Sequence, residues 1–176
     1  MTLSMFRCAK ALLLLLTFWL MAAHATAQQP VFQDALLDHL VGRWLLQGTV
    51  AGQKTTQDID AAWVLEHQYL RIHEVSREQN KEGKPFYEAI VFIGWNQKSG
   101  EYACAWLDVY GGITPFSLGY AKRTQDEIPF LFKDEDNTFH TTFTYFPKGD
   151  TWFWRLDSEQ KGVLSPYGRL TLTRVE

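Results

Sequence analysis

Hydrophobic and polar residues alternate in short runs from Gly42 to the C-terminal end of the chain. The runs are rich in β-branched and aromatic side chains and are bounded by turn residues, which is typical of β-strands. Charged turns or turns with Gly and Pro separate them, for example at Asp134–Asn137 and Pro147–Asp150. The pattern predicts ten strands, at residues 43–50, 55–64, 69–76, 86–95, 101–108, 116–122, 128–133, 138–146, 151–157 and 168–175.

One short helix precedes the strands, at residues 33–40. Asp34 is placed to cap its first turn, and Gly42 is placed to end it. The apolar stripe of this helix consists of Leu36, Leu37 and Leu40. The later segments predict strands and turns, so consecutive strands should be antiparallel neighbours.

A meander of antiparallel strands leaves exposed sheet edges unless it closes on itself, and closure into a barrel removes those edges. We therefore expect an all-β fold: an antiparallel up-and-down β-barrel of about ten strands with a short N-terminal helix. A β-sandwich is the alternative architecture, but the short, regular strand spacing favours the barrel. A barrel of this size can hold its own side chains or a small ligand.

The first strand begins with a short motif, Leu40–Trp44, which is followed by Gly48. This motif resembles the Gly-x-Trp start of lipocalins and other calycins, and the segment Arg169–Arg174 resembles the last calycin strand. The resemblance implies a barrel with a central cavity. It also implies structural roles for Gly42, Trp44 and Arg174, with the Arg174 guanidinium stacked on the Trp44 ring.

The layout is similar, more narrowly, to small exported bacterial calycin-like (lipocalin-like) proteins of uncharacterised function. The segments that carry this similarity are Phe92–Asn96, Gly100–Tyr102 and Trp106–Asp108. The resemblance covers most of residues 34–175 and implies no fixed chemistry, because one fold hosts many functions.

Residues 1–27 have the parts of a secretory signal peptide. Arg7 and Lys10 give a positive first region, the thirteen-residue run Ala11–Ala23 is apolar, and small residues follow it. A membrane anchor is the alternative, but a spanning helix needs about 20 apolar residues. We therefore expect a signal peptide over 1–27 and a single β-barrel domain over 28–176, exported to the periplasm or secreted by a bacterium, with no membrane span after cleavage.

Composition narrows the class of protein further. With 46% hydrophobic and 21% charged residues, the chain does not fit a disordered, collagen-like or multi-pass membrane protein. Its formal charge of −3, which cleavage would change to −5, argues against binding to nucleic acid. Cleavage would also leave Cys104 as a single cysteine, which we expect to be a buried, small, apolar side chain.

The strand at 69–76 has two different faces, one with Tyr69, Arg71 and His73 and the other with Leu70, Ile72 and Glu74. In one interpretation the aliphatic face is inside and Arg71 and His73 are in water. In the other, Arg71 and His73 line a polar cavity, where Arg71 binds an acidic ligand group and His73 donates a hydrogen bond.

The strand at 151–157 poses the same choice. Trp152, Trp154 and Leu156 share one face, which we favour as the interior, and Arg155 lies on the other. Aromatic residues also alternate along 101–108 and 138–146, as core filling or as a ligand-lining wall. The candidate ligand-binding residues are Arg71, His73, Trp106, Tyr145, Trp154 and Arg155.

Motifs for known chemistry are missing from the sequence. The chain has no nucleophile elbow, P-loop or dinucleotide fingerprint, and its Cys and His residues lack zinc spacing, so we predict no cofactor, no metal site and no catalytic residue. Asp58 and Asp60 fit a solvated strand face. The segment Asp108–Pro115, with its glycine pair, is either a mobile lid at a barrel mouth or an ordinary glycine turn.

Three functions follow from these observations. The first is an exported barrel that binds a small, at least partly apolar ligand in its central cavity. Such a ligand is either apolar or amphipathic. The second is a protein-interaction or scaffold barrel filled by its own side chains, for which a homodimer is one form. The third is a cavity enzyme, an isomerase or hydrolase of unknown substrate, which would need at least two of Arg71, His73 and Arg155 to point inward.

Overall fold

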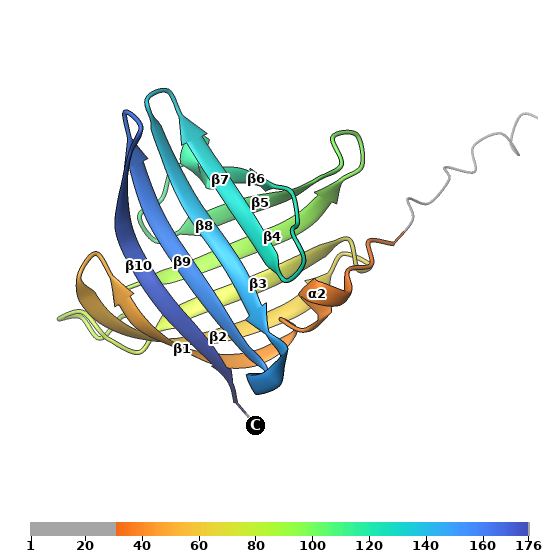
Figure 1. Ribbon diagram of the computed structural model, residues 1–176. Helices are drawn as coiled ribbons and strands as arrows, with labels where there is room; N and C mark the ends of the chain where they lie inside the picture. Colours follow the sequence, from red (N-terminus) through yellow and green to blue (C-terminus); the bar gives the residue numbers. More distant parts are fainter. Residues whose placement is uncertain (1–30, 176) are drawn as a thin grey trace, which may run out of the picture. The chain divides into compact units, whose positions relative to one another are not determined.

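The computed structural model describes residues 31–175, and of residue 115 only the backbone. Within this range the chain forms a closed antiparallel barrel in which each strand pairs with its sequence neighbours and β1 pairs with β10 (Figure 1). This confirms the predicted all-β, ten-stranded barrel. The strands are β1 Gly42–Val50, β2 Gln53–Val64, β3 Tyr69–Ser76, β4 Glu88–Asn96, β5 Glu101–Asp108, β6 Leu118–Ala121, β7 Glu127–Asp134, β8 Asn137–Phe146, β9 Thr151–Gln160 and β10 Val163–Arg174.

The last hairpin is longer than predicted. The sequence pattern predicts no strand over residues 158–167, but β9 and β10 continue through this segment to a two-residue turn at Lys161 and Gly162, whose φ angles are 49° and 79°. Positive φ at both positions fits the twist of a two-residue hairpin. The extension is mostly exposed and lacks apolar alternation, so its pattern gave no strand signal.

The helix α2 is shorter than expected and spans Ala35–Asp38. Asp34 is its N-cap, as predicted, because its Oδ1 accepts hydrogen bonds from the backbone N–H groups of Leu36 and Leu37. The three predicted apolar residues Leu36, Leu37 and Leu40 are buried. Burial against the barrel therefore holds this single turn in place, since so short a helix is marginal alone.

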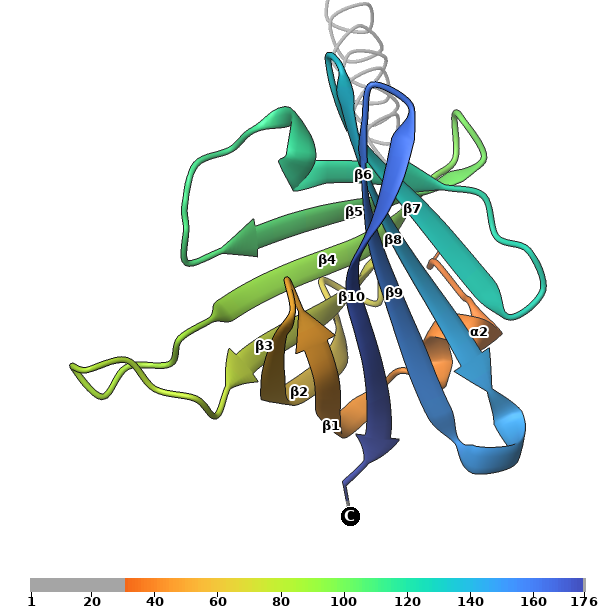
Figure 2. The same cartoon turned by 60° about the vertical axis from the view of Figure 1, so that its left-hand side comes forward.

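The helix lies at the end of the barrel where β1 begins and β10 ends. The Trp44 indole Nε1 donates to the Leu40 carbonyl at 2.7 Å, and the Trp63 indole donates to Asp38 at 2.8 Å. The β3–β4 and β5–β6 connections project on the other side of the barrel (Figure 2). We call this other end, where β3 ends and β4 begins, the mouth.

The predicted contact between the first and last strands is present. Trp44 and Arg174 are opposite each other in the β1–β10 register, and the Arg174 guanidinium carbon is 4.0 Å from the Trp44 ring centroid. Arg174 also donates to the Val41 and His39 carbonyls. Gly42 has a φ of +123°, and a Cβ there would lie 2.7 Å from Arg174 Nη1, which explains the glycine at this position.

Aromatic side chains cross the middle of the barrel. Trp106 of β5 meets Trp154 of β9 edge to face, with ring centroids 6.5 Å apart, although these strands are not neighbours. Trp154 stacks on Phe143, and Trp106 also contacts Phe132 edge to face. We call Trp106, Phe132, Phe143 and Trp154 the aromatic layer. These rings connect β5 with β9 across the interior, between the α2 end and the mouth.

No helix within residues 31–175 is long and apolar enough to cross a membrane. The predicted signal peptide over residues 1–27 lies outside the described residues.

Candidate functional site

The aliphatic face of β3 points into the barrel. Leu70 and Ile72 are fully buried, so Arg71 and His73 lie on the outer face. Arg71 forms an ion pair with Asp60, and His73 Nε2 pairs with Glu88 Oε1 at 2.8 Å. The interpretation with the aliphatic face inside is therefore confirmed. The alternative, in which the candidate ligand-binding residues Arg71 and His73 line a polar cavity, is wrong, because burying Leu70 and Ile72 turns both side chains outward.

The favoured face of β9 is also confirmed. Trp152 and Trp154 are buried in the core, whereas Arg155 is exposed and its Nε lies 3.4 Å from Asp157 Oδ2. The placement of Arg155 as a lumen charge is thus wrong. An enzyme site that uses Arg71, His73 and Arg155 together inside the barrel is excluded by their outward positions.

Glu74 is the acidic group that the inward face of β3 carries into the barrel. Its side chain alternates in phase with Leu70 and Ile72, and only 3% of the residue is exposed. One carboxyl oxygen, Oε1, is buried without a hydrogen-bond partner. Burial, followed by the charge of Asp108, raises the pKa of Glu74 from 4.5 to about 8. Glu74 is not among the candidate residues predicted from the sequence.

Other polar side chains gather around Glu74 from adjacent strands. Glu74 is opposite Ala89 in the β3–β4 register, and Ala89 is opposite Asp108 in the β4–β5 register. On the other side, Gln57 of β2 pairs with Ser76, two residues from Glu74 on the same face. We call the set Gln57, Glu74, Ser76, Tyr87 and Asp108 the interior polar cluster.

Gln57 supplies a second unpartnered acceptor in this cluster. It is 5% exposed, and its amide nitrogen donates to Thr55 Oγ1 at 3.4 Å, while its Oε1 is buried without a partner. Gln57 and Glu74 are diagonal neighbours across β2 and β3, a spacing that long side chains can bridge. Two unpartnered acceptor oxygens therefore come from diagonal positions on the inward faces of adjacent strands.

Tyr87 links the interior polar cluster to the aromatic layer. Its hydroxyl oxygen accepts a hydrogen bond of 2.8 Å from the Trp106 indole Nε1 and keeps its own proton for donation. Burial is the main cause that raises the pKa of Tyr87, and the charge of Glu74 adds to it, so the phenol stays protonated. Trp106 is one of the candidate residues predicted from the sequence, and it connects the interior polar cluster with the aromatic layer.

Cys104 is buried in the core, as expected. Burial, with a contribution from Glu74, raises the pKa of its thiol well above the usual value. The thiol is therefore protonated at neutral pH and a poor nucleophile.

Two buried indole N–H groups also lack partners, those of Trp152 and Trp154. Trp154 belongs to the aromatic layer and was a predicted candidate, while Trp152 packs on Tyr145 nearer to α2, with ring centroids 5.1 Å apart. Buried polar atoms are usually hydrogen-bonded, and unpaired ones are costly. These two indole N–H groups are therefore further donors that an acceptor in the interior could satisfy.

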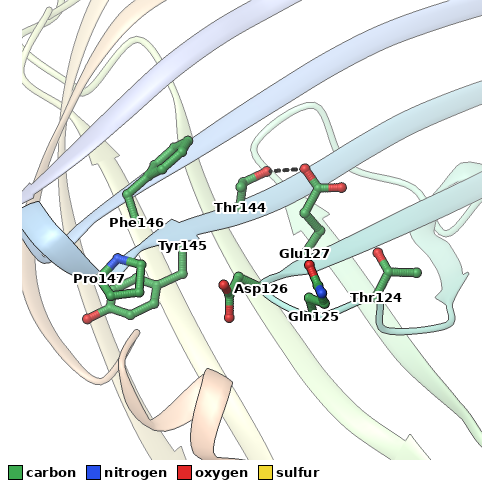
Figure 3. A pocket seen from close by; sticks show the side chains of 8 residues that line it. All are labelled: Thr124, Gln125, Asp126, Glu127, Thr144, Tyr145, Phe146 and Pro147. Atoms are coloured by element: carbon green, nitrogen blue, oxygen red, sulfur yellow. Dashed lines mark hydrogen bonds between the residues drawn. The ribbon is translucent and has the colours of Figure 1, made fainter.

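The candidate Tyr145 lies elsewhere. Its ring stacks on His39 at 4.4 Å, and its hydroxyl donates to Asp150 Oδ1 at 3.1 Å. It lines a groove of about 410 Å³ near the α2 end, where Thr144 donates to Glu127 (Figure 3). The groove contains residues 124–127 and 144–147 and is separate from the interior polar cluster.

Two further expectations can be compared with the structure. In Asp108–Pro115, Gly111 and Gly112 have φ angles of 71° and 80°, and the loop leads into the 3-10 turn Pro115–Ser117. Asp58 and Asp60 pair with Arg77 and Arg71 on the outer face, in agreement with a solvated strand face.

The described part of the chain contains no cluster of side chains suited to bind a metal ion. Within residues 31–175, the His, Cys, Asp and Glu side chains form no group of three or more that could hold a metal ion.

In comparisons with known proteins, no family model and no curated protein matches this chain. The site is therefore interpreted from its own geometry.

Proposed function

We propose that this barrel binds a small, partly apolar ligand in its interior, between the aromatic layer and the mouth. The observation that supports it most directly is the pair of buried, unpartnered acceptors, Glu74 Oε1 and Gln57 Oε1. A buried polar group without a partner costs about 1–3 kcal/mol, and a polar ligand group would remove that cost.

The aromatic layer suits the apolar part of such a ligand. Trp106 and Trp154 offer large ring surfaces at the level where the polar cluster begins. Binding sites for small molecules combine apolar walls with a few placed polar groups. A ligand limited by the layer on one side would be small, with its polar group toward Glu74.

The predicted signal peptide complements this proposal. Cleavage and export would place the barrel outside the cytoplasm, where it would carry its ligand in the periplasm or the surrounding medium. The calycin-like motif at Gly42–Trp44 is compatible with such a role. An exported binding protein is thus the function that we favour.

Native mass spectrometry of protein purified from its own host tests the proposal, with denatured extracts to identify any small molecule released. The variant Ala89→Leu adds bulk to the interior next to Glu74, and the control Ile90→Leu changes the neighbouring residue on the outer face. We expect a bound mass on wild type and Ile90→Leu, and its loss from Ala89→Leu. Thermal unfolding checks that both variants fold, since overpacking costs about 1–3 kcal/mol.

Two results would contradict the proposal. One is wild-type protein without any bound molecule that also fails to bind a library of small aromatic and aliphatic compounds at millimolar concentration. The other is a folded Ala89→Leu variant that keeps the bound mass unchanged.

A second candidate function, a protein-interaction barrel, is favoured by the outer face of β4, β5 and β6. Ile90 and Leu107 pair across β4 and β5 and are 39% and 42% exposed, and Leu118 and Tyr120 continue the apolar surface on β6 at 44% and 41%. Such surfaces often mark interfaces. The occupant we consider is a second copy of the chain, and light scattering at several concentrations tests it: a dimer that Leu107→Lys disrupts supports the idea, and a monomer throughout excludes it.

A further inference from the structure

Toward the mouth, the titratable side chains on the inward faces of β3 and β5 are acidic. Inward positions of β3 and β5 carry Glu74 and Asp108, while the bases Arg71 and Arg155 point outward and pair with acids there. On the inward faces of the described strands the basic side chain is Arg174, which lies at the α2 end against Trp44. The mouth end therefore favours a ligand group that is positive or donates hydrogen bonds.

The unpartnered atoms of the interior polar cluster are acceptors, whereas the unpartnered Trp154 indole N–H belongs to the aromatic layer. Glu74 Oε1 and Gln57 Oε1 both require donors, and they project from diagonal positions on adjacent strands. A carboxylate or phosphate on a ligand would offer only acceptors to these two oxygens, and its negative charge would lie near Asp108 and oppose ionisation of Glu74. A group with several N–H donors satisfies both oxygens.

The rings beside these oxygens reinforce this choice. The Trp106 indole donates to Tyr87, so its N–H end reaches the interior polar cluster, and its ring continues into the aromatic layer with Trp154. The faces of tryptophan rings attract organic cations through the ring quadrupole. An acidic group next to indole rings is thus a suitable environment for an ammonium group with an apolar substituent.

We propose that the ligand is a small organic amine, whose ammonium N–H groups donate to Glu74 Oε1 and Gln57 Oε1 while its apolar part lies against Trp106 and Trp154. This inference rests on the proposed interior binding function and names its ligand class. The charge of this ligand is opposite to that of the acidic group that Arg71 would bind in the alternative interpretation of β3, because the acid Glu74 and not the base Arg71 faces the interior.

Binding of an ammonium group should release a proton. The titratable groups that face Glu74 are Asp108 and Cys104 on β5 and Tyr87 before β4. The pKa of Glu74, raised to about 8 by burial, keeps its carboxyl mostly protonated at pH 7 in the free protein. An adjacent cation favours the ionised form, so Glu74 gives its proton to solvent while the ammonium keeps its own.

Isothermal titration of the barrel with three probes of similar shape tests the ligand class. The probes are 2-phenylethylamine, 2-phenylethanol and 3-phenylpropanoate, which present a cation, a neutral donor and an anion. We expect the amine to bind at least about tenfold more tightly than the other two, since hydrogen bonds that involve a charged group are stronger than those between neutral groups. Titration in two buffers of different ionisation enthalpy should show close to one proton released per amine at pH 7.

The matched variants are Glu74→Gln, on the inner face, and Glu88→Gln, on the outer face of the next strand. Glu74→Gln should weaken amine binding about tenfold or more and abolish proton release, whereas Glu88→Gln should change neither. The proton count in wild type keeps the test valid should Glu74→Gln fold poorly.

The outcomes separate the two proposals. Equal or tighter binding of the alcohol or the anion, blocked by Ala89→Leu, would overturn the amine assignment and leave interior binding intact. Amine binding without proton release, or undiminished in Glu74→Gln, would also overturn the assignment. Absence of binding by all three probes would overturn the assignment, and the absence of any bound molecule in native mass spectrometry would then remove the binding function as well.

Discussion

The two ends of the barrel interior differ in how their polar groups are partnered. At the α2 end, the indole of Trp44 donates to Leu40, and Asp34 accepts hydrogen bonds from α2 and from the Tyr102 hydroxyl. Toward the mouth, Glu74 and Gln57 each bury an oxygen without a partner. The indole N–H of Trp152 is an unpartnered group nearer the α2 end.

The difference in hydrogen bonding between the two ends indicates which residues stabilise the fold and which are available to a ligand. Partnered polar groups fix the chain into one arrangement, whereas unpartnered ones are costly and are retained where they serve another purpose. Changes at the α2 end should therefore reduce stability at every pH, and changes in the interior polar cluster should affect ligand binding and the pH dependence of stability.

The largest effect is expected for Trp44→Ala. Trp44 is 1% exposed, packs under Arg174 and bonds to Leu40, so its loss should lower the free energy of unfolding by about 3–5 kcal/mol. Denaturant unfolding measures this, with Tyr110→Ala, at a residue 77% exposed, as a control that should change stability by less than about 0.5 kcal/mol. Equal effects of the two variants would break the comparison between a packed end and a free surface.

The pH dependence of stability should come from the mouth end. The folded state holds the Glu74 proton up to a pKa of about 8, while the unfolded chain releases it near 4.5, so stability should fall as pH rises between these values, by a few kcal/mol. Denaturant unfolding from pH 5 to 9 measures the fall. Glu74→Gln should remove it, and Glu135→Gln, in an exposed turn, should retain it. A wild-type profile no steeper than that of Glu74→Gln would refute this account.

Asp34→Ala should have an intermediate effect at the α2 end. The carboxylate caps two backbone N–H groups and accepts from Tyr102, so its removal should cost about 2 kcal/mol. Asp34→Asn keeps a capping oxygen and should lose less. Thermal unfolding compares the two, and an amine titration of the folded Asp34→Asn variant should match wild type. A larger loss in Asp34→Asn than in Asp34→Ala would argue against the capping role.

The smallest effect is expected on the outer face. Arg155 is 51% exposed and lies 3.4 Å from Asp157, so Arg155→Ala should change stability by about 0–1 kcal/mol and leave ligand binding unaltered. Arg169→Ala removes a closer partner of the same buried carboxylate, at 2.6 Å, and should cost more. Chemical denaturation ranks the pair, and the reverse order would show that exposure is a poor guide to these contacts.

The fold could be predicted because its signals are local. Alternation along each run gave the ten strands, and Asp34 gave the start of the helix. The Trp44–Arg174 contact followed from a resemblance at the two ends of the sheet. The hairpin tip around Gly162 was missed, since its polar residues carry no alternation.

The interior site was harder to predict, because a strand pattern shows which residues share a face but not which face is inside. The sequence already grouped Glu74 with Leu70 and Ile72, and an acid in phase with two aliphatic residues was the available signal. The proximity of Gln57 and Asp108 to Glu74 depends on the registers of three strand pairs, which the sequence does not specify.

The short strand β6 determines where the wall of the barrel opens locally. In the described sheet, its pairing with β7 is confined to Gly119 and Tyr120, whereas β7 pairs with β8 along its whole length. Local opening begins where few backbone hydrogen bonds must break. Amide protons of β6 should therefore exchange with deuterated solvent earlier than those of β8 or β9, and this seam would give a small molecule a sideways route to the core without unfolding the rest of the wall.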